Sequence, residues 1–212
     1  TRSNKYSLAI DLGTSGPKTA LISFYGEVVD FEFKDTPIIL FPDGGAEQDP
    51  QGWWNAIVST AKKVISKNLV SPDDIVAVSV TSQWSGTVAV DEKGNHLMNG
   101  IIWMDCRGSE SVKAILRGPF QIQGYPLFKL MTWQKLTGGA PAQSGKDPLC
   151  HILWIKQNQP DVYDKTYKFL EPKDYINLCF TGKFAATYDS ILLHWVTDNR
   201  DSSHIVYNDR LL

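Results

Sequence analysis

The sequence predicts an α/β fold built as one large domain. Strand-like segments come first, an amphipathic helix follows, more strands come next, and the second half is mainly helical. The chain has 212 residues, of which 42% are hydrophobic and 21% charged, so it can bury a sizeable core. It shows no internal repeat and no low-complexity segment. We therefore expect a single domain over residues 1–212.

The chain is expected to open with three consecutive strands that form a meander. Residues 6–12 are a short apolar run that stops at Gly13, and apolar, β-branched character resumes over residues 19–22. A turn at residues 25–26 precedes residues 29–33, where apolar and charged side chains alternate as in a half-buried strand. A glycine-bearing turn thus joins the first two strands in a hairpin.

The first long helix is expected after the Pro- and Gly-rich loop 37–48. Asp49 stands at an N-cap position and Pro50 at the first helical position. Apolar residues then recur at intervals of three and four, which predicts one buried helix face. That face comprises Trp54, Ile57, Val58, Ala61 and Ile65.

Further strands and helices complete the predicted α/β order. Strands are expected at 75–81, a nearly continuous apolar run, and at 87–91 and 100–103, with a hairpin turn at 92–95. Helices are expected at 109–116, 127–136, 149–157 and 172–180, the last one ended by Gly182.

Composition excludes several classes of function. The 21 basic and 23 acidic residues give a net charge of -2, and no block of Lys and Arg runs along a predicted helix, so we expect no nucleic-acid partner. No apolar stretch approaches the length of a membrane span, and the first residues lack a signal-like pattern, so we expect a cytoplasmic protein without a membrane partner. The three cysteines lie far apart and fit reduced thiols, and the four histidines show no metal-binding spacing.

The segment DLGTSGPK, residues 11–18, carries the first candidate site. A Walker-type phosphate loop is excluded because the two glycines are three residues apart instead of five, and because a strand follows where that motif needs a helix. A Rossmann fingerprint is excluded because it needs a third glycine and a helix. Two interpretations remain, namely an ordinary hairpin turn and a phosphate clamp built on a hairpin.

In the phosphate-clamp interpretation, each residue type has a definite chemical task. Gly13 and Gly16 allow backbone N–H groups to turn toward an anion, and the neighbouring hydroxyls add donors. Lys18 supplies a positive charge to a phosphate oxygen, and Asp11 holds Mg²⁺ through water, because that ion keeps much of its hydration shell. The hydroxyl donors are Thr14 and Ser15.

Five segments in order resemble the amino-terminal domain of the FGGY family of sugar and polyol kinases, which includes glycerol kinase and xylulose kinase. They are AIDLGTSGPKTAL, AEQDPQGWW, VSVTSQWSGTVAVDEKGN, GIIWMDCR and FLEPKDYINLCFTGKFAATYDS, and the resemblance runs from about residue 6 to about residue 195. It implies a ribonuclease H-like (actin-like ATPase) domain with a mixed central sheet flanked by helices. It also implies a second such domain, with the active site in the cleft between the two.

The resemblance implies transfer of the γ-phosphoryl group of ATP, with Mg²⁺, to a sugar or polyol hydroxyl. The hairpin is similar to the family's first phosphate-binding motif, so Asp11, Gly13, Thr14, Ser15 and Lys18 would face the nucleotide phosphates and the metal ion. The loop SQWSG is similar to the family's sugar-facing loop, where amide groups serve hydroxyls and an aromatic face serves C–H groups. The residues expected near the substrate are Gln83, Trp84, Ser85, Gly86, Trp103, Asp105 and Arg107.

Alternatives stay open for these substrate residues. The loop could be a surface loop whose Trp84 packs on a neighbour, and Arg107 could simply pair with Asp105 at the surface, where such a pair contributes at most about 1 kcal/mol.

The sequence also departs from the family pattern. The family's catalytic aspartate and its adenine-binding glycines belong to segments beyond residue 212, so we expect no catalytic residue in this chain, a missing carboxy-terminal domain, and little or no kinase activity of the chain alone. Xylulose kinases usually carry a histidine in the sugar loop, and glycerol kinases an arginine followed by a glutamate, whereas this loop has Trp84 and Ser85. His151 stands where a lysine is more frequent. The substrate therefore stays open, and a homodimer is an expectation by resemblance.

A function of another class is compatible with the same sequence features. The chain could be a non-catalytic sugar-binding or assembly module with an actin-like fold. The gene sequence downstream of Leu212 discriminates this module from the kinase domain, because only the kinase needs a second domain there.

Overall fold

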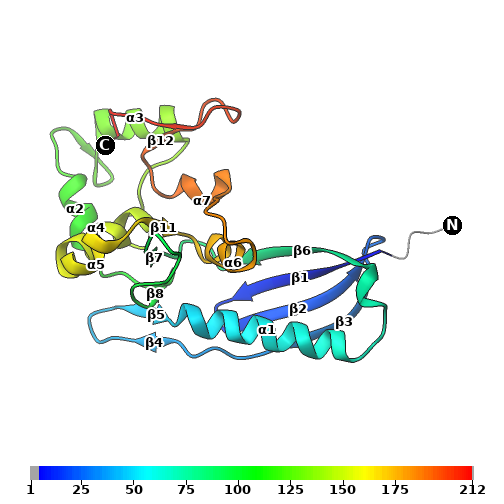
Figure 1. Cartoon of the computed structure of the whole chain (residues 1–212). Helices are drawn as coiled ribbons and strands as arrows, with labels where there is room; N and C mark the ends of the chain where they lie inside the picture. The colour runs from blue at the N-terminus through cyan, green and yellow to red at the C-terminus, as the bar shows by residue number, and fades with distance from the viewer. Residues whose placement is uncertain (1–4, 212) are drawn as a thin grey trace.

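A computed structural model describes residues 5–211. Its largest sheet has the strand order β3-β2-β1-β6, in which β1 (Tyr6–Gly13) is antiparallel to β2 (Gly16–Ser23) and parallel to β6 (Ile75–Ser82). The strand β3 (Val28–Phe33) completes the antiparallel meander. The predicted meander and the mixed central sheet are therefore confirmed (Figure 1).

The helix α1 (Pro50–Ser66) covers one face of this sheet. It begins as predicted, because the Asp49 side chain accepts a hydrogen bond of 2.9 Å from the Gln51 N–H. Its buried face is offset from the prediction, since Trp54, Val58, Ala61 and Ile65 are only half-buried. The buried residues are Pro50, Trp53, Ala56, Ile57, Thr60 and Val64.

A buried hydroxyl explains part of this offset. The Thr60 hydroxyl lies 2.8 Å from the hydroxyl of Thr19 on β2, so a polar residue can face the sheet without an unpaired group. Apolar periodicity does not indicate Thr60, although Thr60 is buried between α1 and the sheet.

The strand β6 differs from the expectation for a continuous apolar run. It is an edge strand, and Val76 and Val78 remain 51% and 47% exposed. Among residues 5–211, no strand pairs with its outer edge. Apolar content predicted the strand correctly but did not predict its burial, because burial depends on which elements pack beside it.

Short strands link the sheet to the helical half. The buried strand β5 (Ala46–Gln48), in a segment expected to be a loop, pairs with β4 (Ile39–Leu40) and β8 (Gly100–Ile101). The strand β7 (Val88–Val90) pairs with β11 (Lys168–Leu170). The predicted turn 92–95 is present, because the Asp91 N–H donates to the Asn95 carbonyl.

The predicted helices of the second half are present within one or two residues of the expected bounds. They are α2 (Ser109–Ile115), α3 (Leu127–Thr137), α4 (Pro148–Asn158) and α6 (Pro172–Thr181). Gly182 ends α6 in the left-handed conformation, with a φ of 66°. The sequence patterns also did not predict β11, or α5 (Pro160–Lys165), α7 (Tyr188–Leu192), η1 (Pro72–Asp74), β9 (Gln121–Ile122), β10 (Tyr125–Pro126), β12 (Thr197–Asp198) and β13 (Val206–Tyr207).

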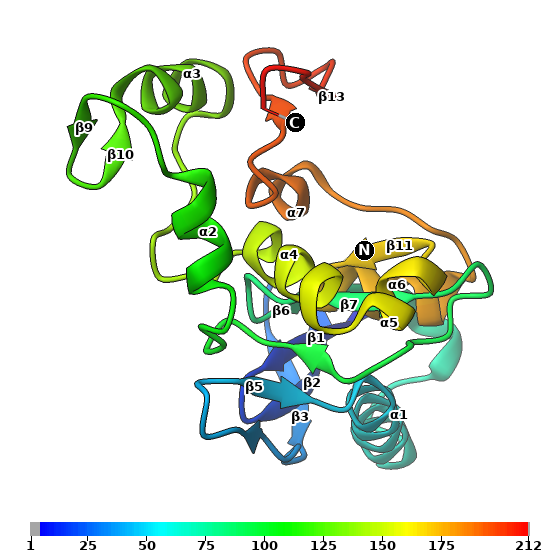
Figure 2. The ribbon, with the colours of Figure 1, turned by 90° about the vertical axis from the view of Figure 1, so that its left-hand side faces the viewer.

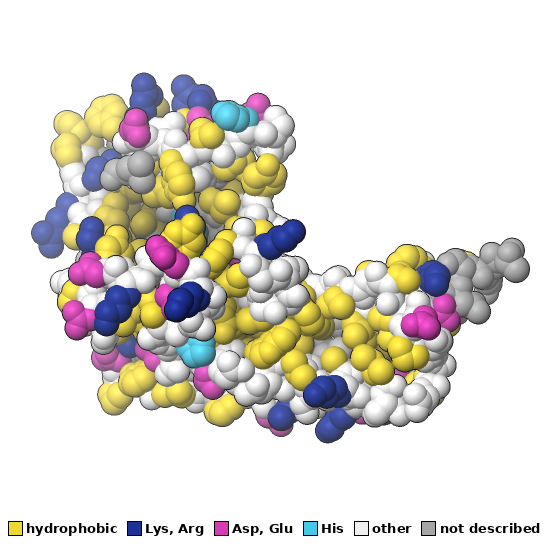
Figure 3. Space-filling model, in the orientation of Figure 1, with side chains coloured by type: hydrophobic (Ala, Val, Ile, Leu, Met, Phe, Trp, Pro, Cys, Tyr) yellow, Lys and Arg dark blue, Asp and Glu magenta, His cyan; other side chains and the backbone are white. Residues whose placement is uncertain are grey.

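The helical half stands to one side of the sheet. Figure 1 and Figure 2 both place α3 and the segment with β12 and β13 farthest from the central sheet. The face in Figure 3 carries Lys and Arg interspersed with Asp and Glu. Apolar side chains gather on it over the central sheet and α1. Within the described part of the chain, no helix is long and apolar enough to cross a membrane.

Candidate functional site

The predicted phosphate hairpin lies at the end of β1, next to the end of β6 where the predicted sugar loop begins. Its turn requires Gly16, which has a φ of 141° and whose Cα lies so close to Lys34 that a Cβ would stand 2.1 Å from the Lys34 carbonyl oxygen. Asp11 and Lys18 are cross-strand partners, and both are exposed.

These two charged groups share one face of the sheet. The neighbouring residues Ile10 and Leu12 belong to the core under α1, so alternation along β1 directs Asp11 to the opposite face. There Asp11 and Lys18 line an open hollow of about 340 Å³ and are its charged members. The hollow therefore offers a carboxylate and an ammonium group side by side.

This donor set fits a hydrated magnesium ion better than a metal site made by the protein alone. Among residues 5–211, no group of three or more His, Cys, Asp or Glu side chains could hold a metal ion. Mg²⁺ is commonly held by one or two carboxylates, with water and phosphate oxygens completing the octahedron. A single carboxylate beside a cationic group is compatible with a Mg²⁺–phosphate ligand.

Two buried glutamines connect the hairpin to the predicted sugar loop. Gln83 donates from Nε2 to Oε1 of Gln48 at 2.8 Å, and Gln48 donates from Nε2 to the Thr14 carbonyl at 2.9 Å. The Gln83 N–H also donates to the Leu12 carbonyl at 2.7 Å. The Nε2 and backbone N–H groups of Gln83 thus bind protein groups, while its buried Oε1 atom has no hydrogen-bond partner in the described part of the chain.

Trp103 joins the hairpin directly, although 89 residues separate it from Thr14. Its Nε1–H donates to Oγ1 of Thr14 at 2.9 Å, and its side chain is 43% exposed. The ammonium group of Lys146 lies 5.8 Å from the ring centre. Trp84 is 55% exposed, so two exposed tryptophans accompany the hairpin and the loop.

Backbone constraints explain the next two loop residues. Ser85 adopts a φ of 64°, and its hydroxyl donates to the Lys146 carbonyl at 2.6 Å. A Cβ on Gly86 would lie 2.5 Å from Cγ of Pro172, at the start of α6. The Gly86 N–H donates to Oε2 of Glu171 at 3.1 Å. Both residues therefore shape the loop through contacts with protein groups.

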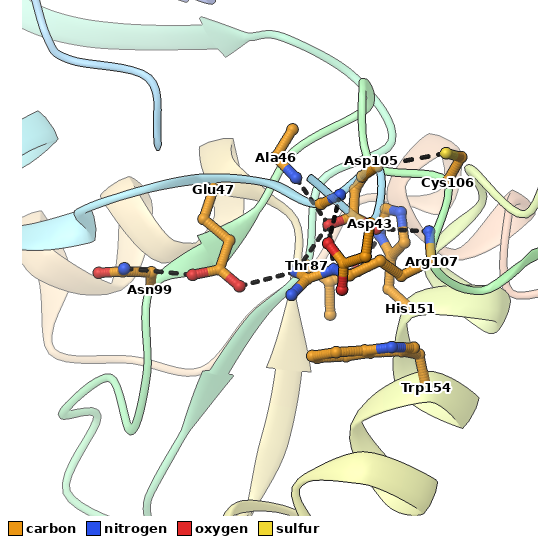
Figure 4. Close-up of polar contacts among 12 residues, drawn as sticks. Asp43, Ala46, Glu47, Thr87, Asn99, Asp105, Cys106, Arg107, His151 and Trp154 are labelled. Atoms are coloured by element: carbon orange, nitrogen blue, oxygen red, sulfur yellow. Dashed lines mark hydrogen bonds and ion pairs between the residues drawn. The ribbon is translucent and has the colours of Figure 1, made fainter. Parts of the chain in front are cut away.

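Asp105 and Arg107 form a buried ion cluster with Glu47 (Figure 4). Nη2 of Arg107 lies 2.7 Å from a Glu47 oxygen and 2.6 Å from an Asp105 oxygen, and the three side chains are between 1% and 9% exposed. The guanidinium stacks on the Trp154 ring, 3.8 Å from its centre. These polar groups are satisfied within the protein, so their side chains are not free to bind a substrate in this structure.

Sequence patterns missed several residues that hold the site together. Gln48 lies in the segment expected to be a loop, and Lys146 precedes α4 in a stretch without periodicity. His151 is fully buried, its Nδ1 lies 3.1 Å from the Thr87 hydroxyl, and burial lowers its pKa to about 4, so it is neutral at pH 7. The resemblance itself covers Gln48, through AEQDPQGWW, but no local signal distinguished it.

A family model and curated relatives of this chain all come from carbohydrate kinases. A model of the FGGY family of carbohydrate kinases, N-terminal domain, matches residues 6–198. The xylulose kinase of Bacillus subtilis (strain 168) is 30% identical over 194 residues, which cover 90% of this chain and 36% of that protein. The xylulose kinase of Escherichia coli (strain K12) is 28% identical over 179 residues, which cover 84% of this chain and 34% of that protein.

Solved structures show the same fold. A gluconate kinase from Lactobacillus acidophilus matches with a TM-score of 0.79 and 22% identity, covering 98% of this chain and 39% of that one. A glycerol kinase from Plasmodium falciparum, solved with ADP, matches with a TM-score of 0.79 and 17% identity, covering 98% of this chain and 40% of that one. The expected ribonuclease H-like (actin-like) class is thereby confirmed. The chain spans only about a third of the length of the curated relatives that it matches.

Proposed function

The chain belongs to the FGGY family of carbohydrate kinases, and from this premise we propose that it is the first domain of an enzyme that phosphorylates a sugar or polyol hydroxyl with ATP. Residues 1–212 would bind the phosphates and the acceptor, and the catalytic base and adenine site would come from a second domain of the whole protein. In this proposal, the isolated chain has little or no kinase activity.

One observation carries the proposal. The predicted phosphate hairpin and the predicted sugar segments are far apart in the chain, yet Thr14 contacts both Trp103 and the Gln48–Gln83 pair. A kinase must hold a phosphoryl donor and an acceptor hydroxyl side by side, because most of its rate enhancement comes from positioning and from charge stabilisation. Convergence of the two candidate sites on one hydroxyl-bearing residue supports that arrangement.

On the nucleotide side, Lys18 would place a positive charge near a phosphate oxygen, and Asp11 would hold Mg²⁺ through its water ligands. Gly13, Thr14 and Ser15 would contribute backbone and hydroxyl donors from the turn. When bound, ATP supplies the transferable phosphoryl group, and Mg²⁺ neutralises part of its charge.

On the acceptor side, Trp84 and Trp103 would pack against the C–H face of the acceptor. Gln83 and Ser85 would bind hydroxyls as acceptors, through Oε1 of Gln83 and through the oxygen of the Ser85 hydroxyl, whose proton is already donated to the Lys146 carbonyl. Gly86 would allow the loop to lie against α6, and Asp105 and Arg107 would position the segment that carries Trp103. The xylulose kinases among the relatives make xylulose the first acceptor to assay.

The test is ADP release by the chain, expressed together with any natural sequence beyond Leu212, over a panel of xylulose, other pentoses, hexoses, gluconate and glycerol. We expect one acceptor to stimulate turnover, Asp11→Asn and Lys18→Met to lower kcat at least a hundredfold, and Trp84→Ala to act mainly through KM. Glu110→Gln, an exposed change on α2, is the control.

Two results would contradict the kinase. If the reading frame ends at Leu212 and no acceptor stimulates ADP release, a non-catalytic sugar-binding or assembly module replaces it. If turnover persists unchanged in both hairpin variants, the assignment of the hairpin to the nucleotide is wrong.

A further inference from the structure

A second cavity lies behind the predicted sugar loop, away from the phosphate hairpin. It has a volume of about 230 Å³ and is formed by β11, the start of α6, and the segment 184–194 that leads through α7. Much of its lining is apolar or aromatic, as in small-molecule sites generally. The apolar lining includes Phe169, Leu170, Phe184, Ile191 and Tyr207.

Two buried carboxyl groups line this apolar cavity. Glu171 is 3% exposed and Asp174 is 1% exposed. Oε2 of Glu171 accepts the Gly86 N–H, whereas its Oε1 is buried and has no hydrogen-bond partner among residues 5–211. A buried carboxyl oxygen without a donor is costly, so it marks a place where a ligand donor would be stabilising.

Among the described residues, no basic group around Glu171 forms an ion pair with it. Lys173, on the same helix, forms its ion pair with Asp189 of α7. Burial lowers the pKa of His194 to about 4, so this ring is uncharged at pH 7. Lys168, on β11, is exposed at the rim, with its ammonium group 4.8 Å from the Tyr167 ring centre. The interior of the cavity thus has acidic groups and aromatic faces but no buried cation among the described residues.

We propose that this cavity binds a small organic ammonium ion, whose N–H group donates to the free oxygen of Glu171 and whose apolar part fills the aromatic lining. An ammonium group supplies both the donor and the charge that buried carboxylates need. Aromatic faces attract cations as well as apolar groups. An apolar cavity of 150 Å³ is known to hold benzene, so this one accommodates a ligand of roughly eight or nine heavy atoms.

Ionisation of the carboxyls supports this ligand chemistry. Burial raises the pKa of Glu171 to about 8 and also raises that of Asp174. A bound cation would favour the ionised carboxylate, so binding should release a proton below about pH 8. Because Glu171 also holds the Gly86 N–H, the ligand would contact the residue that supports the predicted sugar loop. The site itself does not depend on the proposed kinase activity.

The test is isothermal titration calorimetry of the 212-residue chain with benzylamine and with its neutral analogue, benzyl alcohol. We expect benzylamine to bind at least tenfold more tightly near pH 8, and its affinity to rise tenfold or more between about pH 6 and pH 8. Glu171→Gln should remove at least tenfold of the affinity for benzylamine, whereas Glu110→Gln on the surface of α2 should leave it unchanged. The Gly86 amide resonance should shift on saturation with benzylamine.

Equal affinity for the alcohol, or full affinity in Glu171→Gln, would overturn the proposal, and so would the absence of binding by either probe. If Glu171→Gln does not fold by circular dichroism, the pH series on the natural sequence decides. An affinity for benzylamine that does not change with pH would then count against the site.

Discussion

The substitution Glu171→Gln should stabilise the unliganded protein at neutral pH, because it replaces a buried ionisable carboxyl group by a neutral amide. Gln has nearly the same shape, and its side-chain oxygen can still accept the Gly86 N–H that Glu171 Oε2 now accepts. The difference lies in ionisation. At neutral pH the unfolded chain exposes an ionised carboxylate to water, whereas burial forces the folded protein to hold Glu171 mostly protonated, and taking up that proton costs free energy.

The size of this stabilisation follows from the pKa of Glu171 in the unfolded and in the folded state. The pKa of Glu171 rises from 4.5 in the unfolded chain to about 8 in the folded protein, because burial penalises the charged form. A folded-state pKa above the unfolded value means that the stability contributed by the protonated group is complete below pH 4.5 and is lost progressively up to about pH 8. At pH 7 that loss is about 3 kcal/mol, from about 1.4 kcal/mol for each pH unit above 4.5.

The assay is urea unfolding of the natural chain and of Glu171→Gln near pH 5 and near pH 7, with Glu110→Gln as the exposed control. We expect the variant to gain about 3 kcal/mol over the natural chain at the higher pH and less than about 1 kcal/mol at the lower pH. The control should show no comparable dependence on pH. A constant difference at both pH values, or a loss of stability at pH 7, would refute the assignment of a costly buried carboxylate.

Three other substitutions test the rest of the structure. Arg107→Met should destabilise the protein by about 3–5 kcal/mol, because it leaves two buried carboxylates without their cation. Arg200→Met, which breaks a surface pair, should cost far less, and equal costs in urea unfolding would contradict the buried cluster. Gly16→Ala should destabilise by more than about 3 kcal/mol, since its Cβ would overlap a carbonyl oxygen. Gly138→Ala, whose added Cβ would meet no described atom within 4 Å beyond its local backbone, should cost only about 1 kcal/mol for its positive φ; similar melting temperatures for both variants would show that the hairpin relaxes. Trp103→Phe keeps the aromatic face but removes the N–H that donates to the Thr14 hydroxyl. In the proposed kinase it should raise KM for ATP or the acceptor severalfold in steady-state kinetics, with an unchanged circular dichroism spectrum.

Much of the secondary structure could be predicted from local patterns, because the determinants are local. The hairpin at residues 6–23, the N-cap at Asp49 and the stop at Gly182 depend on turn chemistry within a few residues. The short strand β5 could not be predicted, since three residues carry no periodic signal and become a strand only through their pairing with β4 and β8.

In the candidate site too, some features depend on local sequence and others on tertiary contacts. From residue types alone, the segment around Asp11 and Lys18 was compatible with a phosphate clamp or an ordinary turn, and the family resemblance favoured the clamp. Pairing in the hairpin places the two charged residues side by side. Their connection to Trp103 depends on how the segment after β8 folds back onto the hairpin. The burial of Arg107 depends on Glu47 and Trp154, which come from two other parts of the chain.

By itself, the sequence determined the order of the main strands and helices, because these depend on residue type and on spacing over a few residues. The resemblance of five segments along the chain identified the family. Tertiary structure alone decided which side chains are exposed, which carboxyls are paired, and that Glu171 lies buried behind the predicted sugar loop with an oxygen that no described residue contacts by a hydrogen bond. Burial and hydrogen bonding are set by neighbours brought from distant positions, and a carboxyl group that is ordinary in water acquires an unusual pKa only when those neighbours exclude the water.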